Sequence, residues 1–170
     1  MLILYIQVQP HASMKIASIL SPSRTHCRIA VSSKKRAIEK AAELIASNDS
    51  RLEENVLYSQ LIAREKVSPT GLGKGIAIPH CRMAGCNAII GSLITLQSPI
   101  EFDAIDGLPV STLFVLIVPE HETKVHLEVL SMLVQNFENP SFHSRILAAS
   151  DSESLYLAAV SDASKVASNT

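Results

Sequence analysis

Apolar residues recur at helical spacing, three and four positions apart, in several segments of the chain. This spacing predicts helices over residues 33–46, 54–66, 123–137, 141–149 and 152–160. The positions expected to face the core are Ile38, Ala41, Ala42 and Ile45 in the first helix, Val56, Leu57, Leu61 and Ile62 in the second, and Leu130, Leu133, Val134 and Phe137 in the third. Ser33 and Asp151 precede the first and last of these helices and are predicted to cap them.

Three shorter apolar segments predict strands, over residues 76–78, 88–96 and 110–118. The last of them, VSTLFVLIV, is almost continuously apolar, as expected for a central strand covered on both faces. Residues 68–75, SPTGLGKG, hold three glycines and a proline and are predicted to form an irregular loop. The alternation of helices and strands predicts an α/β fold, a single domain with a central mixed β-sheet flanked by α-helices.

The composition narrows the class of protein further. A length of 170 residues is typical of one domain, and 47% hydrophobic against 18% charged residues excludes intrinsic disorder. Fifteen Lys and Arg balance 16 Asp and Glu, so no basic field favours nucleic acid or an anionic membrane as a partner. The apolar segments are too short to cross a bilayer, and residues 1–11 lack the features of a signal peptide. Three cysteines without framework spacing favour a reducing cytoplasm.

Two histidines, His80 and His126, occupy positions where α/β proteins build sites. His80 follows a short strand, a proline that restrains the backbone, and the glycine-rich loop, whose N–H groups can approach an anion. His126 lies in the first turn of the helix that follows the central strand. A neutral imidazole is a nucleophile suited to carrying a phosphoryl group, which cations and N–H dipoles stabilise. Arg64, Thr70 and Lys74 are available for such contacts, and the alternative for either histidine is an ordinary packed side chain.

Other chemistry in the same region has weaker support. Cys81 beside His80 suggests a thiol nucleophile, but adjacent residues at a strand end point apart and no orienting acid is evident. Cys81 and Cys86 have poor spacing for zinc and no fourth ligand, so buried structural cysteines are the alternative. Asp103 and Asp106 suggest paired acid–base carboxylates, yet an Asp-Gly pair is a strong turn signal and a turn before the central strand is favoured.

Several motifs together resemble one family: GLGKGIAIPH (71–80), SPIEFDAIDGLPV (98–110), LFVLIVPE (113–120) and HLEVLSML (126–133). This family is the enzyme IIA domain of the mannitol/fructose class of the bacterial phosphotransferase system. SKKRAIE (33–39) and LIAREK (61–66) also resemble its nitrogen-regulatory branch. The resemblance covers residues 14–160. Residues 1–13 are then expected to be an extension, either a misassigned start or a loosely attached segment, and the polar residues 161–170 a flexible tail.

The resemblance implies a role for each site residue. His80 is the phosphorylated histidine, through Nε2, while His126 contacts the phosphoryl group without being phosphorylated and Arg64 stabilises it. Thr70 and Gly71 contribute loop contacts to phosphate, and neither a metal nor a cofactor is implied. The departures from the family pattern are Ser68, Pro69 and Lys74, where Gly, Ser and Asn are common. They remove one loop N–H and add a cation that lies either beside the phosphate or in solvent.

The resemblance also implies a function. It indicates a phosphohistidine-carrying regulator that accepts a phosphoryl group from a nitrogen-type histidine phosphocarrier and controls protein targets, such as potassium-transport or sensor-kinase components. The alternative is an enzyme IIA component that passes phosphate to a fructose- or mannitol-type sugar permease. Nucleic-acid binding and membrane insertion are not expected.

Overall fold

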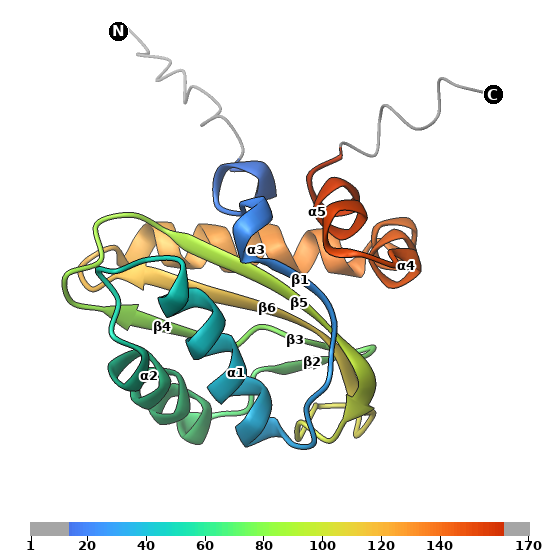
Figure 1. Ribbon diagram of the computed structural model, residues 1–170, viewed down its shortest axis with the longest axis horizontal. Coiled ribbons are helices and arrows are strands. Elements are labelled where there is room, and N and C mark those ends of the chain that lie inside the picture. Colours follow the sequence, from blue (N-terminus) through green and yellow to red (C-terminus); the bar gives the residue numbers. More distant parts are fainter. Residues whose placement is uncertain (1–13, 162–170) are drawn as a thin grey trace, which may run out of the picture.

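Strand β6 (Val110–Pro119) lies at the centre of a six-stranded mixed sheet (Figure 1). The computed structural model describes residues 14–161. The other strands are β1 (Thr25–Ile29), β2 (Gly71–Gly73), β3 (Ile76–Ala77), β4 (His80–Met83) and β5 (Ile90–Ile100). They follow the order β1-β5-β6-β3-β2, with β4 also paired to β6. β5 runs antiparallel to β6, whereas β3 and β4 run parallel to it. The predicted α/β fold with a mixed sheet is therefore confirmed.

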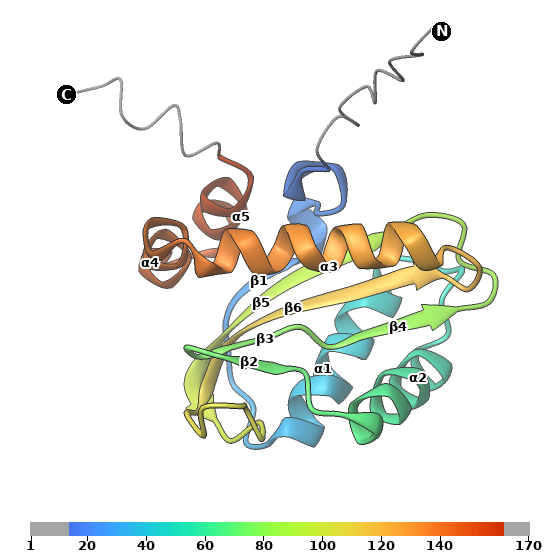
Figure 2. The ribbon, with the colours of Figure 1, turned by 180° about the vertical axis from the view of Figure 1, so that it is seen from behind.

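Helices cover both faces of this sheet (Figures 1 and 2). On one face lie α1 (Lys34–Ser47) and α2 (Glu54–Val67), and on the other lie α3 (Thr123–Glu138), α4 (Pro140–Ala148) and α5 (Ser152–Val160). Two short 3-10 turns, η1 (Ile16–Ser18) and η2 (Pro22–Arg24), precede β1. Because side chains alternate along a strand, β6 contributes to both cores. Leu113, Val115 and Ile117 pack on the side of α1 and α2, while Phe114, Leu116 and Val118 pack on the side of α3.

The predicted helix caps are confirmed. The Ser33 hydroxyl accepts a hydrogen bond from the Arg36 N–H at 3.2 Å, and the Asp151 carboxylate accepts one from the Ser154 N–H at 2.7 Å. One predicted core position is wrong: Val56 is 42% exposed, because α2 turns Leu57 and Leu61 inward instead. The predicted extension, residues 1–13, lies outside the described residues, and so does the predicted tail 161–170 apart from Ser161.

Tandem pairing of β3 and β4 along the same edge of β6 sets up the site. β3 pairs with Thr112 and Leu113, and β4 pairs with Leu116 to Pro119. Pro79 interrupts the two strands, and its carbonyl accepts a hydrogen bond from the Leu116 N–H at 2.9 Å. His80 therefore begins β4 at a fixed register against Leu116, near the middle of the sheet.

Candidate functional site

His80 is buried, with 9% of its surface exposed, and its ring orientation is fixed by the backbone two residues earlier. Its Nδ1 lies 2.8 Å from the Ile78 carbonyl oxygen. A carbonyl can only accept a hydrogen bond, so Nδ1 carries the ring proton and Nε2 carries the free lone pair. The short β3–Pro79–β4 connection thus selects one nitrogen of His80 as a nucleophile.

Arg64, in the last turn of α2, meets that nitrogen. Its Nε–H donates to His80 Nε2 at 3.2 Å, and its Nη1–H donates to the Ser68 carbonyl at 2.9 Å. A cation that already faces the nucleophilic nitrogen is placed to contact whatever anion becomes attached there.

His126, in the first turn of α3, completes the group. Its ring lies edge-on to that of His80, with centroids 5.2 Å apart and an interplanar angle of 66°. The side chain is 8% exposed, and its buried Nδ1 finds no hydrogen-bond partner among residues 14–161. The structure therefore brings together His80, Arg64 and His126, three of the residues singled out from the sequence.

Burial lowers the pKa of both imidazoles from the ordinary value of 6.5. For His80 the hydrogen bond to Ile78 opposes this shift, and the charge of Arg64 adds to it. For His126 burial acts first, followed by the charges of His80, Arg82 and Arg64. Both rings are therefore neutral at pH 7, which is the form in which Nε2 of His80 can attack an electrophile.

Arg82 is a charged residue near the histidine pair that the sequence reasoning missed. It lies two residues beyond His80 in β4, and the alternation of a strand places the two on the same face. After burial and the charge of His80, its charge adds to the lowering of the pKa of His126. The period of two, applied to the residues after His80, is the signal that would have found it.

Thr70, expected to contact phosphate, has its side chain and N–H engaged elsewhere. The N–H donates to Glu65 Oε1 at 2.9 Å and the hydroxyl donates to Glu65 Oε2 at 2.5 Å. Gly71 follows in β2, where a Cβ would lie 2.8 Å from the Cα of Ala104, so glycine is needed there for close packing. The loop is also more regular than predicted, because Gly71–Gly73 form β2.

Lys74 does not join the histidine pair. Its side chain is exposed, and its N–H donates to Asp106 Oδ2 at 2.8 Å in the tight turn between β2 and β3. Its charge contributes to the lowered pKa of His143, after burial, and not to that of His80. Of the two expectations for Lys74, the structure favours the one in which it lies in solvent.

The competing chemistries find no support in the geometry. Cys81 points into the core beneath α1 and α2, opposite to His80, and burial raises its pKa to about 12. Asp106 accepts hydrogen bonds from the Lys74 and Leu108 N–H groups, which makes it a turn residue, as favoured from the sequence. Within residues 14–161 no three His, Cys, Asp or Glu side chains gather as a metal site would require.

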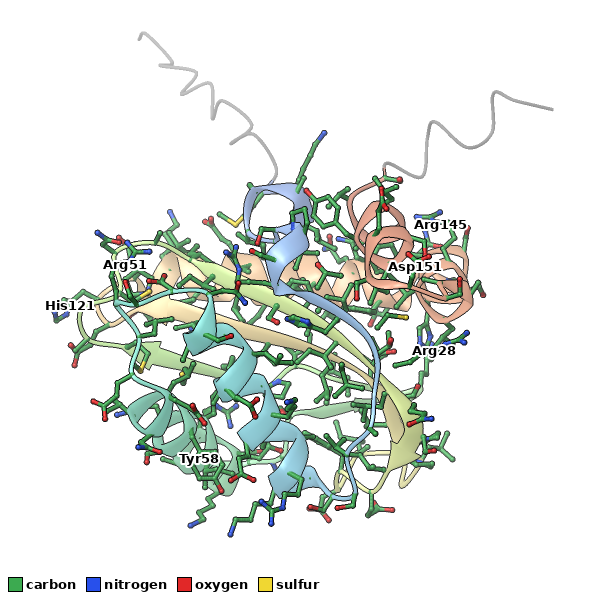
Figure 3. All side chains as sticks on the ribbon, in the orientation of Figure 1. Arg28, Arg51, Tyr58, His121, Arg145 and Asp151 are labelled. Atoms are coloured by element: carbon green, nitrogen blue, oxygen red, sulfur yellow. The ribbon has the colours of Figure 1, made fainter. Side chains whose placement is uncertain are left out.

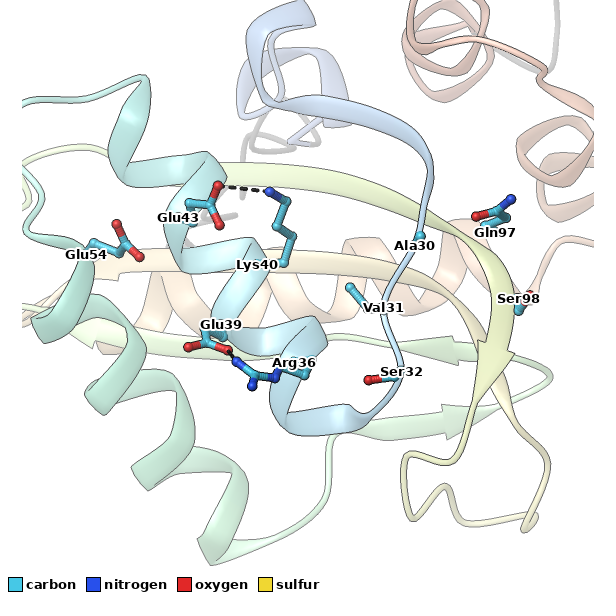
Figure 4. A pocket seen from close by; sticks show the side chains of 10 residues that line it. All are labelled: Ala30, Val31, Ser32, Arg36, Glu39, Lys40, Glu43, Glu54, Gln97 and Ser98. Carbon is cyan, nitrogen blue, oxygen red and sulfur yellow. Dashed lines mark hydrogen bonds and ion pairs between the residues drawn. The ribbon is translucent and has the colours of Figure 1, made fainter.

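A groove of about 710 Å³ lies away from these histidines, between α1 and the segment after β1 (Figure 4). Of its five charged side chains four pair within α1, Arg36 with Glu39 at 2.6 Å and Lys40 with Glu43 at 2.9 Å, and the fifth is Glu54 of α2. They leave no convergent set of groups for chemistry. None of the helices in the described part of the chain is long and apolar enough to span a bilayer.

Comparison with known proteins agrees with this geometry. The family model for the phosphoenolpyruvate-dependent sugar phosphotransferase system, EIIA 2, matches residues 18–159. The nitrogen regulatory protein of Pseudomonas aeruginosa is 40% identical over 143 residues, which cover 84% of this chain and 93% of the relative.

Solved structures give the same result. The crystal structure of the nitrogen regulatory protein IIA-Ntr from Neisseria meningitidis is 41% identical and superposes with a TM-score of 0.76, covering 84% of this chain and 97% of that one. The IIA mannitol structure from Escherichia coli, at 17% identity and a TM-score of 0.65, covers 82% of this chain and 97% of that one and shares the fold. With the family model matched along nearly all of the described residues, the chain belongs to the EIIA 2 family of the phosphotransferase system and is a homologue of its nitrogen regulatory proteins.

Proposed function

We propose that His80 accepts a phosphoryl group at Nε2 from a nitrogen-type histidine phosphocarrier in the cytoplasm, and that the phosphorylation state of His80 regulates the binding of partner proteins. The observation that carries the proposal is the orientation of His80. Nδ1 donates to Ile78, and Nε2 faces the Arg64 guanidinium.

The transfer follows from this arrangement. The lone pair of His80 Nε2 attacks phosphorus in line, the P–N bond of the donor phosphohistidine breaks, and its electron pair returns to the donor imidazole. Nδ1 keeps its proton and its bond to Ile78 throughout. Arg64 then contacts the phosphoryl oxygens, and His126, whose ring centroid lies 5.2 Å from that of His80, donates a hydrogen bond to them.

Apolar side chains beside the site favour docking of a protein donor. Val67, the last residue of α2 and three residues after Arg64, is 81% exposed. Leu127, next to His126 in the sequence, is 63% exposed. A phosphoryl group on His80 adds nearly two negative charges to this site, so a partner that packs beside it distinguishes the two forms. We expect regulatory targets, such as potassium-transport or sensor-kinase components, to distinguish the phosphorylated from the unphosphorylated protein in this way.

The homology to nitrogen regulatory proteins favours regulation over sugar transport. In the alternative, the same phosphohistidine passes its phosphoryl group to a fructose- or mannitol-type permease. Transfer to a purified permease domain at a rate comparable to acceptance by His80 would favour this alternative, whereas partner binding that depends on phosphorylation would favour the regulator.

Intact-mass spectrometry at neutral to basic pH tests the proposal. The protein is incubated with phosphoenolpyruvate, the general first enzyme and the phosphocarrier, beside His80→Ala and the exposed control His121→Ala, whose side chain projects from the turn before α3 (Figure 3). We expect one acid-labile phosphate on the wild type and on His121→Ala and none on His80→Ala. Phosphate on His80→Ala, or none on the wild type, contradicts the assignment.

A further inference from the structure

Glu65 is a buried carboxylate that the transfer described above does not use. It lies beside Arg64 in the last turn of α2 and is 6% exposed. Glu65 accepts hydrogen bonds from the N–H and the hydroxyl of Thr70. It also forms an ion pair with Lys34 of α1, whose Nζ lies 2.8 Å from Oε1. Lys34 is itself placed over the Phe102 ring, 5.1 Å from its centroid. A buried carboxylate is costly unless it is fully paired, and this one is paired by Lys34 of α1 and by Thr70 in the connection before β2.

A continuous run of hydrogen bonds leads from Glu65 to the ring of His80. Thr70, held by Glu65, accepts at its carbonyl from the Ile78 N–H at 3.1 Å. The Ile78 carbonyl in turn accepts from His80 Nδ1–H at 2.8 Å. The bond that selects the tautomer of His80 is therefore fixed through Thr70.

The contact made by the other ring nitrogen, Nε2 of His80, depends on the same segment of the chain. Arg64, which faces Nε2, precedes Glu65 directly and also binds the Ser68 carbonyl, two residues before Thr70. Closure of the 65–70 segment by the Glu65–Thr70 pair thus fixes the contacts of both ring nitrogens at once.

We propose that Glu65 is the positioning residue of His80, acting through Thr70, with Lys34 as its counter-ion. Thr70 on this view is a structural link rather than a phosphate ligand. The consequence for phosphotransfer rests on the function proposed above, whereas the consequence for the His80 tautomer does not.

The test compares Glu65→Gln and Thr70→Val with the control Glu54→Gln, an exposed carboxylate in the first turn of the same helix. Nitrogen NMR of the imidazoles reports the tautomer of His80, and the Arg64 Nε–H signal reports the bond to Nε2. We expect a single Nδ1–H tautomer in the wild type and in Glu54→Gln, and a mixture in both site variants. In Glu65→Gln and Thr70→Val we expect the rate of phosphorylation by the carrier to fall about tenfold or more, because small misplacements of a reacting group slow the reaction strongly.

Thr70→Val keeps the shape of the side chain and removes only the hydroxyl bond, so it decides the question if Glu65→Gln fails to fold. Thr70→Ser restores the hydroxyl, and we expect it to recover the tautomer. An unchanged tautomer and rate in Thr70→Val and a folded Glu65→Gln would overturn the positioning role. Altered tautomers in a protein whose wild type is never phosphorylated would instead keep that role and reject the proposed function.

Discussion

At the scale of single residues, the phosphotransfer proposed above depends on a backbone carbonyl. Ile78 accepts from Nδ1 of His80 and so leaves Nε2 free to react. Their positions in the sequence single out His80, His126 and Arg64 as candidates. The resemblance gives each an expected role, and the structure places the three side by side. Glu65 could not be predicted in the same way, because a glutamate in a polar helix turn is ordinarily solvated. Its burial depends on Thr70 and Lys34, contacts that only the folded chain makes.

Replacing His126 by alanine tests its contact with the phosphoryl group. We expect the rate of phosphorylation to fall about 100-fold, as when one preorganised donor is removed from a charged transition state. The fold should persist, because the buried Nδ1 has no hydrogen bond to lose among the described residues. Quenched time points in the mass assay, together with a thermal melt, measure both effects. A normal rate would show that His126 is only a packed side chain.

At the scale of elements, the periodicity of apolar residues predicted the long helices and strands but not the short strands and their pairing. The five helices and β6 were predicted within a few residues, because each presents enough apolar positions to show its period. β1, β2 and β4 were not predicted. Their sequences THCRI, GLG and HCRM carry little apolar pattern, and they are strands because β5, β3 and β6 offer them hydrogen-bonding partners.

The cap of α1 gives a prediction at this scale. Ser33→Ala removes the acceptor for the Arg36 N–H and should lower the free energy of unfolding by about 0.5–2 kcal/mol. Ser33→Asp keeps an acceptor at the same position and should retain most of the stability. Urea unfolding followed by circular dichroism compares the two. Equal losses in both variants would mean that the hydroxyl bond does not stabilise the helix.

At the scale of the whole molecule, four histidines among residues 14–161 have lowered pKa values, each first because of burial: His26, His80, His126 and His143. The unfolded chain binds protons at these rings near pH 6.5, whereas the folded protein binds them only at lower pH. Stability is therefore full above pH 6.5 and falls as the pH drops below it, down to the folded-state pKa values.

Urea midpoints at pH 7.5, 6.5 and 5.0 check this prediction, and we expect the main loss between the last two. Asp49, Asp106 and Asp151 have pKa values lowered from 3.8, so their contribution is lost only at more acidic pH and does not enter this window. His26→Gln should flatten the profile. A midpoint that stays constant or rises toward pH 5.0 would contradict the histidine origin.

Met14 and Ser161 line the same small pocket, of about 270 Å³, with Met132 and Asn136 of α3. This pocket lies beside η1 and α5, whereas α2 lies on the opposite side of the molecule (Figures 1 and 2). His126, ten residues before Asn136, lies about 15 Å away along the helix axis. The first and last described residues thus meet at one pocket, remote from the face that holds His80 and His126. A surface or a label attached through a side chain that lines this pocket would therefore leave the face around His80 and His126 uncovered.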